Sequence, residues 1–371
     1  MDFDFSDDQE QLRDAVRKWV DKGYDFDRRR ASVAAGGFDR AAYGELAELG
    51  LTGLYVSEEH GGMGMGPTEA MVTMEELGRG IVLEPLTQTL ITSATLQTHA
   101  PAALQSAWLP RMAAGEAIVV LAYQERGARY QLSRCAAQGS ESNGAWSVSG
   151  TKSVVAVGDQ ADAFVVPATV NGQIALFLVE RSASGVSTQG YITQDGSRAA
   201  EVMLNQAPAQ LITLNGLTAL EEAVDIGMAC VCAEAVGVMD KTLAITVDYM
   251  NTRKQFGVNI ASFQALRHRV ADMKMQLELG RSMSYYASLK LHAPAEERRR
   301  AMARAKYQLG VSMRFIGQQA VQLHGGIAVT DEYIVSHYFK KLTQLDMSFG
   351  DTLHQLGEVS ARMQDTAGVF A

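Results

Sequence analysis

The C-terminal part of the chain carries three long helical patterns in close succession, and this feature restricts the possible fold most strongly. The patterns cover residues 217–252, 264–291 and 294–324 of a 371-residue chain. Helices of this length that are joined by short loops pack antiparallel against one another. Gly325 follows the third pattern directly and is placed to end that helix, because glycine adopts a left-handed backbone at no steric cost. We predict a helical bundle of the four-helix type over residues 213–371.

The N-terminal part is also predicted to be helical. Ser6 and Gln9 have the spacing of a capping box, in which each residue's side chain bonds to the other's backbone at a helix start. Helical spacing, proline starts and glycine stops indicate further helices over residues 40–49, 68–77, 86–98 and 102–114. The glycine-rich stretch 50–64 is predicted to be a loop. These patterns predict an N-terminal helical domain over residues 1–117.

The middle of the chain changes from helical to alternating hydrophobicity. Short β-type runs cover residues 145–150, 163–166 and 174–179. Asn143-Gly144 and Asn171-Gly172 are strong hairpin turns, because Asn and Gly tolerate the positive φ that two-residue turns require. We predict a middle antiparallel β domain over residues 118–212. The order of helical domain, β domain and helical bundle gives an α+β fold.

Charge and cysteine content argue against several classes of function. The net charge of −9 argues against general nucleic-acid binding. The sequence contains no run of eighteen apolar residues, which a membrane-spanning helix would need. The acidic residues Asp2 and Asp4 are unlike the start of a signal peptide. Three cysteines are too few for a disulfide framework, and the seven histidines show no metal-ligand spacing. We expect a cytoplasmic protein that binds no metal, nucleic acid or membrane.

A first segment with the features of a dinucleotide site follows the first long helical pattern. Arg253 is followed by Gln255, Phe256 and Gly257, and Gln264 comes seven residues after that glycine. The planar guanidinium of an arginine can donate two hydrogen bonds to one phosphate. The segment therefore predicts a grip on a pyrophosphate.

A second such segment ends the third long helical pattern, where Gln322 is followed by Gly325 and Gly326. Two consecutive glycines let a backbone approach a bulky ligand, because neither carries a Cβ. The alternative is that Gln264 and Gln322 are surface amides and that the glycines only end the helix.

These segments, in this order and at this spacing, resemble the acyl-CoA dehydrogenase family, flavoproteins that desaturate acyl-CoA thioesters. The resemblance covers essentially the whole chain, since the family has the same order of domains. It implies an acyl-CoA substrate and FAD as the cofactor, which supplies the hydride acceptor that no side chain provides. It also implies dinucleotide contacts, partly across a dimer interface, from Arg253, Gln255, Phe256, Gln264, Gln322, Leu323, His324, Gly325 and Gly326.

The family's catalytic base is absent from both of its usual positions. That base is a glutamate in a Tyr-Glu-Gly-Thr segment, and Phe349 stands in its place. Some members carry the glutamate on the first long helix of the bundle, one residue before an arginine, and the corresponding pair here is Gly227-Met228. Asp351 is the remaining candidate, because desolvation raises a carboxyl pKa toward the range that a general base needs. The alternative for Asp351 is a turn residue.

The β domain departs from the family as well. Usual members carry Thr-Glu-Pro-Gly-x-Gly-Ser and Lys-x-Trp-Ile-Thr segments, which help to hold the flavin ring. The corresponding residues are 124–130, QERGARY, and 152–156, KSVVA. The resemblance therefore implies that these contacts to the flavin ring are lost or replaced.

A subset of the family works as paired unlike subunits, one of which keeps the base while the other has a degraded site. They act on CoA thioesters of bulky or dicarboxylic acids, including sterol side chains and pimeloyl-like substrates. Segments 158–162, 251–257 and 323–326 resemble the degraded partner. This implies a subunit of a heterotetramer in lipid or steroid catabolism, with a homologous partner that carries the catalytic glutamate.

In that arrangement Arg253 and Gln264 would complete the partner's flavin site, and electron-transfer flavoprotein is a candidate electron acceptor. Two alternatives remain open. One is a self-sufficient homomeric dehydrogenase or oxidase that uses Asp351, and the other is a non-catalytic assembly subunit.

Overall fold

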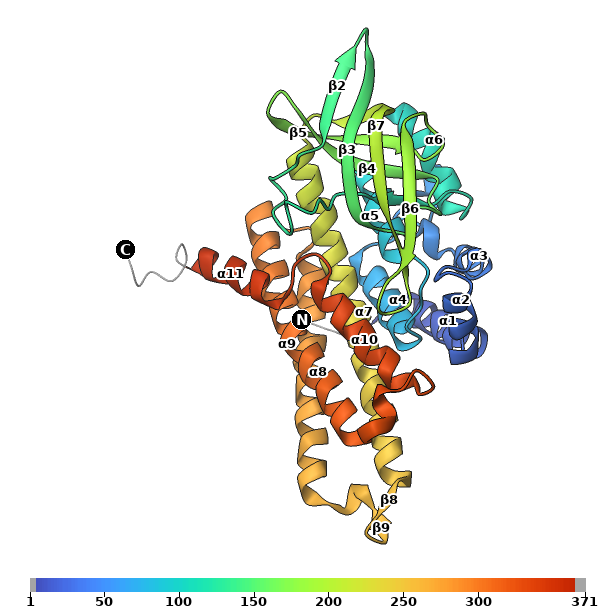
Figure 1. The fold of residues 1–371 in the computed structure, drawn as a ribbon, viewed down its shortest axis with the longest axis vertical. Helices are drawn as coiled ribbons and strands as arrows, with labels where there is room; N and C mark the ends of the chain where they lie inside the picture. Colours follow the sequence, from blue (N-terminus) through green and yellow to red (C-terminus); the bar gives the residue numbers. More distant parts are fainter. Residues whose placement is uncertain (1–4, 364–371) are drawn as a thin grey trace. The chain divides into compact units, whose positions relative to one another are not determined.

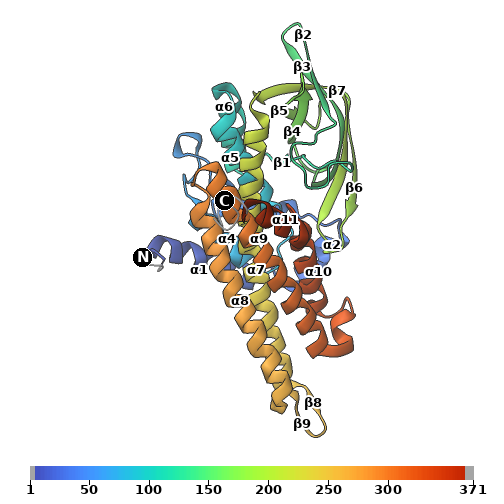
Figure 2. The same cartoon turned by 90° about the vertical axis from the view of Figure 1, so that its left-hand side faces the viewer.

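The computed structural model describes residues 5–363, which form two compact units (Figures 1 and 2). The sheet unit comprises residues 28–66 and 83–227. The bundle unit comprises the described residues up to 27, residues 67–82 and those from 228 onward. The acidic residues Asp2 and Asp4 lie outside the described residues.

The helices of the sheet unit agree with the sequence patterns, with one addition. The elements are α2 (Phe26–Ala34), α3 (Arg40–Glu48), η1 (Leu51–Gly53), η2 (Glu58–His60), α5 (Leu86–His99) and α6 (Ala102–Ala113). The helices predicted over 40–49, 86–98 and 102–114 are confirmed within one residue at each end. Helix α2 was not predicted, and the glycine-rich stretch contains the two short 3₁₀ helices η1 and η2.

A seven-stranded sheet forms the rest of this unit. Its strands are β1 (Val119–Leu121), β2 (Gln138–Ser142), β3 (Ala145–Ala156), β4 (Ala163–Val170), β5 (Gln173–Glu180), β6 (Val186–Ile192) and β7 (Arg198–Thr213). The strand order is β1-β4-β2-β3-β7-β5, with β6 beside β7 and a further pairing of β4 with β5. That last pairing closes β4, β2, β3, β7 and β5 into a barrel.

The sheet is mostly antiparallel, as predicted, and also contains parallel pairings that were not predicted. Strands β1 and β4 pair in parallel, with Val119 opposite Ala163, and β2 makes one parallel pairing with β4. The other pairings are antiparallel. A parallel pair needs a long crossover connection, and residues 122–162 supply it between β1 and β4.

The two predicted hairpin turns are confirmed. Asn143 and Gly144 have φ of 50° and 80°, and Asn171 and Gly172 have φ of 49° and 81°. Positive φ at both central residues is typical of a type I′ turn, whose twist matches that of the two strands it joins. Inside the barrel the core side chains are fully buried, among them Val148, Phe164, Val166, Phe177 and Val202.

The bundle unit is built from long helices that lie side by side in both views (Figures 1 and 2). Its elements are α1 (Asp7–Gly23), α4 (Pro67–Arg79), α7 (Gly216–Thr252) from residue 228, α8 (Gln264–Lys290), α9 (Ala295–His324), η4 (Gly325–Val329), α10 (Ile334–Met347) and α11 (Thr352–Met363). The three long predicted helices and the one predicted over 68–77 are confirmed. So is the capping box, in which Ser6 Oγ accepts from the N–H of Gln9 at 3.3 Å. Helices α10 and α11 were not predicted individually.

The boundaries of the three domains stay a prediction. The change from helix to strand occurs near Val119, and the change from strand to helix lies between Thr213 and Gly216, close to the predicted residues. The two compact units divide the chain differently, because α1 and α4 belong with the C-terminal helices.

Helices α4 and α7 approach closely through two glycines. A Cβ added at Gly78 of α4 would lie 2.1 Å from the carbonyl oxygen of Glu234. A Cβ added at Gly237 of α7 would lie 1.8 Å from the carbonyl oxygen of Glu75. The backbones of the two helices therefore pack against each other directly, and any side chain at either position would push them apart.

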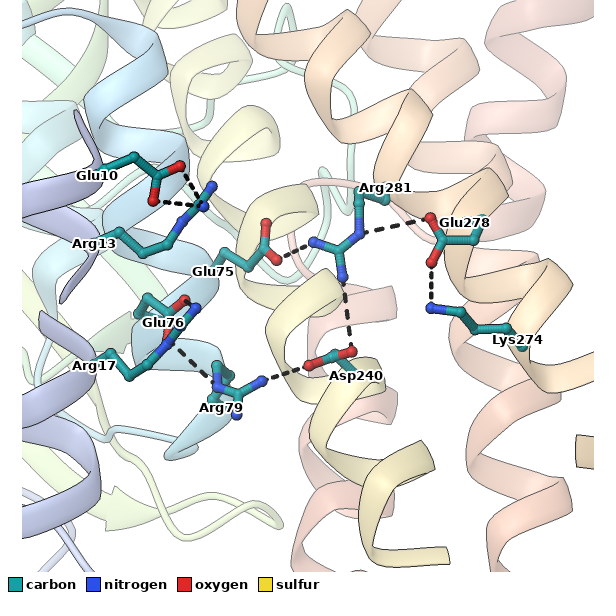
Figure 3. A network of polar contacts seen from close by, with 10 residues as sticks. All are labelled: Glu10, Arg13, Arg17, Glu75, Glu76, Arg79, Asp240, Lys274, Glu278 and Arg281. Carbon is teal, nitrogen blue, oxygen red and sulfur yellow. Dashed lines mark hydrogen bonds and ion pairs between the residues drawn. The ribbon is translucent and has the colours of Figure 1, made fainter. Parts of the chain in front are cut away.

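A polar network joins α1, α4, α7 and α8 next to this crossing (Figure 3). The buried carboxylate of Glu76 accepts from Arg17 at 2.6 Å and lies 3.4 Å from Arg79. Asp240 pairs with Arg79 and lies 3.8 Å from Arg281. A buried charge destabilises a protein when one partner is removed, so this network favours one alignment of the four helices.

Candidate functional site

The two predicted dinucleotide segments lie at one end of the bundle unit. Arg253 directly follows α7, Gln264 is the first residue of α8, and Gln322 lies in the last turn of α9. A hydrogen bond of 2.9 Å from Arg269 Nη1 to Gln319 Oε1 joins the start of α8 to the end of α9. The antiparallel packing of the long helices thus brings together segments that are about 60 residues apart in sequence.

The first segment forms a small hairpin at the tip of α7 and α8. Its strands are β8 (Lys254–Gln255) and β9 (Val258–Asn259). Phe256 and Gly257 both have positive φ, as a type I′ turn requires, and the Phe256 side chain is 91% exposed. The backbone of Arg253 is fixed, since its N–H donates to Tyr249 and its carbonyl accepts from Ile260 at 2.9 Å. Its guanidinium is exposed on this fixed backbone.

The second segment is fixed by aromatic packing. The His324 ring stacks on Tyr249 with 4.4 Å between the centroids, and Tyr249 Oη donates to His324 O at 3.2 Å. Tyr333 completes the cluster at 5.4 Å from the His324 ring. The side chains of His324 and Leu323 are buried, at 4% and 6% exposure, so any dinucleotide contact here comes from the backbone. Sequence reasoning missed Tyr249, although it lies one helical turn before Arg253.

The glycine pair has the open surroundings that a bulky ligand needs. A Cβ added to Gly325 or Gly326 would meet nothing within 4 Å, and both residues are exposed. Gly325 has φ of 69° and ends α9, as predicted. The predicted donors to an anionic dinucleotide at this end are the amides of Gln264 and Gln322 and the guanidinium of Arg253, whereas the N–H of Gly325 already donates to Val321 O. These donors are the residues of this chain that would hold the phosphate part of FAD.

The buried imidazole of His324 predicts a loss of stability in mild acid. Burial lowers the pKa of His324 below its usual value of 6.5, although a backbone contact with Ala320 opposes the shift. Nδ1 lies 2.8 Å from Ala320 O and donates to it, and Nε2 has no hydrogen-bond partner among residues 5–363. The fold thus favours the neutral ring, so its contribution is complete above pH 6.5 and declines as the pH falls toward the lowered pKa.

We therefore expect the denaturation midpoint to fall between pH 7.5 and 5.5, and His324→Phe to reduce this fall because phenylalanine keeps the stacking and does not titrate. The measurement is chemical denaturation at several pH values. The control is the exposed His292, since the His292→Gln variant should show the same pH dependence as the parent protein. A His324→Phe profile that matches the parent would contradict this prediction.

The β-domain positions that hold the flavin ring in the family have structural roles here. Lys152 is fully buried, and its Nζ donates to Glu125 Oε1 at 2.6 Å. Ser153 Oγ donates to Glu201 Oε2 at 2.9 Å. Val154 has φ of 54°, and its apolar side chain is exposed. The polar groups of this segment are already paired within the sheet unit, so they offer a poor donor set for the flavin ring.

One buried amide joins Phe349 to the helix on which other family members carry the base. Gln355 of α11 is 3% exposed, and its Nε2 donates to Phe349 O at 3.0 Å. The same Nε2 lies 3.5 Å from the sulfur of Met228, on the helix where other members carry the glutamate. The structure therefore brings residues 228 and 349 together although they are far apart in sequence. Neither of them can take a proton from carbon.

The turn that contains Phe349 is held by a buried lysine that sequence reasoning missed. Lys306 of α9 is fully buried, and its Nζ donates to Asp346 O at 2.8 Å and to Gly350 O at 3.2 Å. Desolvation lowers the pKa of Lys306 from its usual value. The sequence did contain a signal for Lys306, namely a charged residue on an apolar helix face. Met302, Ala305 and Leu309 lie around Lys306 at helical spacing.

Asp351 caps a helix. Its Oδ1 accepts from the N–H of His354 at 2.8 Å, and α11 begins at the next residue, Thr352. Aspartate is a favoured N-cap residue because its carboxylate satisfies an amide that the helix leaves unpaired. This contact gives the side chain a local structural role, and its role as a base stays a prediction.

Other features of the described residues bear on binding. Cys230 and Cys232 are buried in α7, and burial raises the pKa of the Cys232 thiol to about 12. Among residues 5–363, no three or more His, Cys, Asp or Glu residues cluster in a way that could hold a metal ion. Over the same range, no helix combines the length and the apolar character needed to cross a membrane.

Comparison with known families assigns the chain to one of them. Residues 215–364 match the model of the acyl-CoA dehydrogenase C-terminal domain, and residues 6–116 match that of the N-terminal domain. The chain belongs to the acyl-CoA dehydrogenase family. Enzymes of this family are oxidoreductases that act on the CH–CH bond of acyl-CoA thioesters, with FAD as cofactor.

Similar proteins include an acyl-CoA dehydrogenase and a solved protein described as a steroid ACAD. The acyl-CoA dehydrogenase IpdE2 of Mycobacterium tuberculosis is 28% identical over 336 residues, which cover 90% of each chain. A solved Tcur3481-Tcur3483 steroid ACAD variant is 27% identical with a TM-score of 0.90, covering 97% of this chain and 99% of that chain. The ChsE4-ChsE5 complex from Mycobacterium tuberculosis, 24% identical with a TM-score of 0.90, has the same fold over 99% of this chain and 100% of that chain.

Proposed function

We propose that this chain is the base-lacking subunit of a heteromeric acyl-CoA dehydrogenase and that a homologous partner carries the catalytic glutamate. The observation that carries the proposal is that Phe349 and Gly227 stand at the two positions where this family carries its base. Both positions are thus occupied by residues that cannot act as a base. The dinucleotide end of the bundle nevertheless keeps its exposed cation and its open glycine pair.

The division of labour follows from these residues. FAD, when bound, supplies the acceptor for the hydride that leaves the β-carbon of the thioester. In our proposal the Arg253 guanidinium donates to the pyrophosphate, and the Gln264 and Gln322 amides orient the dinucleotide. The partner's glutamate takes the α-proton. The aromatic cluster of Tyr249, His324 and Tyr333 supports this grip because it fixes the backbone from which the contacts are made.

The substrate class is proposed from the relatives. The Tcur3481-Tcur3483 protein is described as a steroid ACAD, and the ChsE4-ChsE5 structure is a complex of two named chains. We propose a heterotetramer that works in the cytoplasm on the CoA thioester of a bulky acid, such as a sterol side chain. Electron-transfer flavoprotein is the proposed acceptor, since the reduced flavin must be reoxidised after each turnover.

Flavin content tests this function. We expect the chain expressed alone to be colourless or to aggregate, and the complex with a homologous chain that retains the glutamate to hold about half a flavin per chain. Arg253→Ala should remove most of this flavin from the assembled complex, because a charge-assisted pair with the pyrophosphate is lost. The measurements are the visible absorbance spectrum and the native mass.

The matched control is Arg304→Ala, which removes an exposed arginine of α9 and should leave the flavin content unchanged. A yellow homo-oligomer with one flavin per chain would overturn the proposal and favour a self-sufficient enzyme. In that case Asp351→Asn should abolish turnover without loss of the helix cap, because asparagine caps helices as well as aspartate does. If Arg253→Ala leaves the flavin content of the assembled complex unchanged, the result would favour a non-catalytic assembly subunit.

A further inference from the structure

The turn from Ser348 to Asp351 has a backbone conformation that its sequence does not favour. Phe349 has φ of 56°, in the left-handed region, and Gly350 follows with φ of 108°. For a residue with a Cβ this conformation is strained, because the Cβ approaches the following carbonyl oxygen. A bulky residue stays there only when the surrounding structure imposes it.

Two buried side chains hold this backbone. Lys306 Nζ donates to the carbonyl oxygens of Asp346 and Gly350, on the two sides of Phe349. Gln355 Nε2 donates to the carbonyl oxygen of Phe349 itself. These three hydrogen bonds go to the backbone, so they do not depend on the side chain at position 349.

Close packing confines the turn further. A Cβ added at Gly310 of α9 would lie 2.0 Å from Thr352 Oγ1 and 2.6 Å from Asp346 Oδ1. Asp346 Oδ1 in turn accepts from Thr352 Oγ1 at 2.6 Å and from its N–H at 3.2 Å. The two ends of the turn are thereby tied together directly over the glycine of α9.

We propose that Lys306 is a positioning residue that, together with Gln355, imposes the left-handed backbone at position 349 whichever side chain stands there. The turn would then keep this backbone although phenylalanine stands at the position where the family carries its base. The inference rests on the proposed function only where it identifies position 349 with the base. Its test measures folding stability, so it can fail while the flavin result stands, or stand while the flavin result fails.

The test compares glycine with alanine at position 349 in the full chain. Both Phe349→Gly and Phe349→Ala remove the aromatic ring, so the difference between them reports the backbone conformation. With Lys306 present, glycine should be favoured over alanine by about five-fold in the folding equilibrium constant. In the Lys306→Met background this preference should vanish or reverse, because glycine loses more chain entropy on folding once the turn can relax.

The matched control is Lys341→Met, which removes another buried lysine whose Nζ pairs with Glu234 at 2.7 Å. In that background the preference for glycine at position 349 should stay as in the parent. If Lys306→Met does not fold, Gln355→Met takes its place and should reduce the preference, since it removes the hydrogen bond to Phe349 O. A preference that persists in every background, or is absent from the parent, overturns the proposal.

A spectroscopic measurement separates positioning from general stabilisation. With 4-fluorophenylalanine at position 349 alone, the parent should give one narrow ¹⁹F resonance from a single turn conformation. The same label should give several or broadened resonances in the Lys306→Met background, recorded where that protein is still folded. One unchanged resonance in both backgrounds would also overturn the proposal.

Discussion

Glu125→Gln is expected to destabilise the sheet unit by about 3–5 kcal/mol, the usual cost of leaving a buried charge without its partner. Lys152 is fully buried and Glu125 is 8% exposed, and Nζ lies 2.6 Å from Oε1. The carboxylate also accepts from the N–H groups of Ala136 at 2.7 Å and Ala137 at 3.1 Å. A glutamine amide has only one acceptor oxygen, so its NH₂ group must face one of these three donors. The change can be measured as the denaturation midpoint, followed by fluorescence.

Removing the lysine instead of the glutamate, or both together, tests the same pair further. Lys152→Met should cost less than Glu125→Gln, because the carboxylate keeps two backbone donors and no buried cation remains. The double variant should be more stable than Glu125→Gln alone, since both charges are then gone. At the exposed pair of Lys290 and Glu297, Glu297→Gln should produce no measurable change. Additive losses in the double variant would show that Glu125 and Lys152 do not act as a pair.

The pair also has a defined pH dependence. Burial alone would raise the pKa of Glu125, but hydrogen bonds from Lys152 and from the Ala136 and Ala137 amides outweigh it and lower this pKa. Its stabilisation is therefore present above the unfolded carboxyl pKa of about 4.3 and is lost as the pH falls through the lowered folded value. The loss from Glu125 thus begins below a pH of about 4.3, whereas the loss from His324 begins below pH 6.5.

Gly237→Ala is expected to destabilise the bundle unit by about 3 kcal/mol, at the upper end of the usual range for an overpacked site. The new Cβ would lie 1.8 Å from the carbonyl oxygen of Glu75, and both groups belong to helix backbones. No rotamer change can relieve this contact, so α4 and α7 must separate and the network around Glu76 must shift. The thermal or chemical midpoint of unfolding measures the loss.

Gly357 of α11 is the matched control for this substitution. A Cβ there would meet nothing within 4 Å, and the residue is exposed within a helix. Gly357→Ala should be neutral or stabilising by up to about 1 kcal/mol, the difference in helix propensity between the two residues. Equal effects of Gly237→Ala and Gly357→Ala would show that the crossing of α4 and α7 tolerates a side chain.

The end of α9 was predictable because its signal is local. Gly325 ends α9 for a reason that lies within a few residues, namely the left-handed backbone that follows a helix. The hairpin after Arg253 was not predicted as a hairpin, although its glycine was identified. The side chains of Leu323 and His324 point into the core, so their predicted dinucleotide contacts reduce to those of the backbone.

The absence of the base was also a property of the sequence, since a residue type at a family position needs no structure to be read. Only the structure shows which residues contact this part of the chain. Met228 and Phe349 lie 121 residues apart and meet only because α7 and α11 both reach the buried amide of Gln355. Sequence patterns report the period of one helix and carry no information on which residues of two helices face each other.

The sequence by itself determined the order of helical and β regions, the two type I′ turns, the capping box and the end of α9 at Gly325. Each of these depends on hydrophobic period or turn chemistry within one short stretch of chain. The tertiary structure decided the parallel pairing of β1 with β4, the burial of Lys152 and Lys306 and the strained backbone of Phe349. These features depend on contacts between segments that are distant in sequence. A buried donor is paired with an acceptor from another element, and a glycine lets the backbone of another element come close.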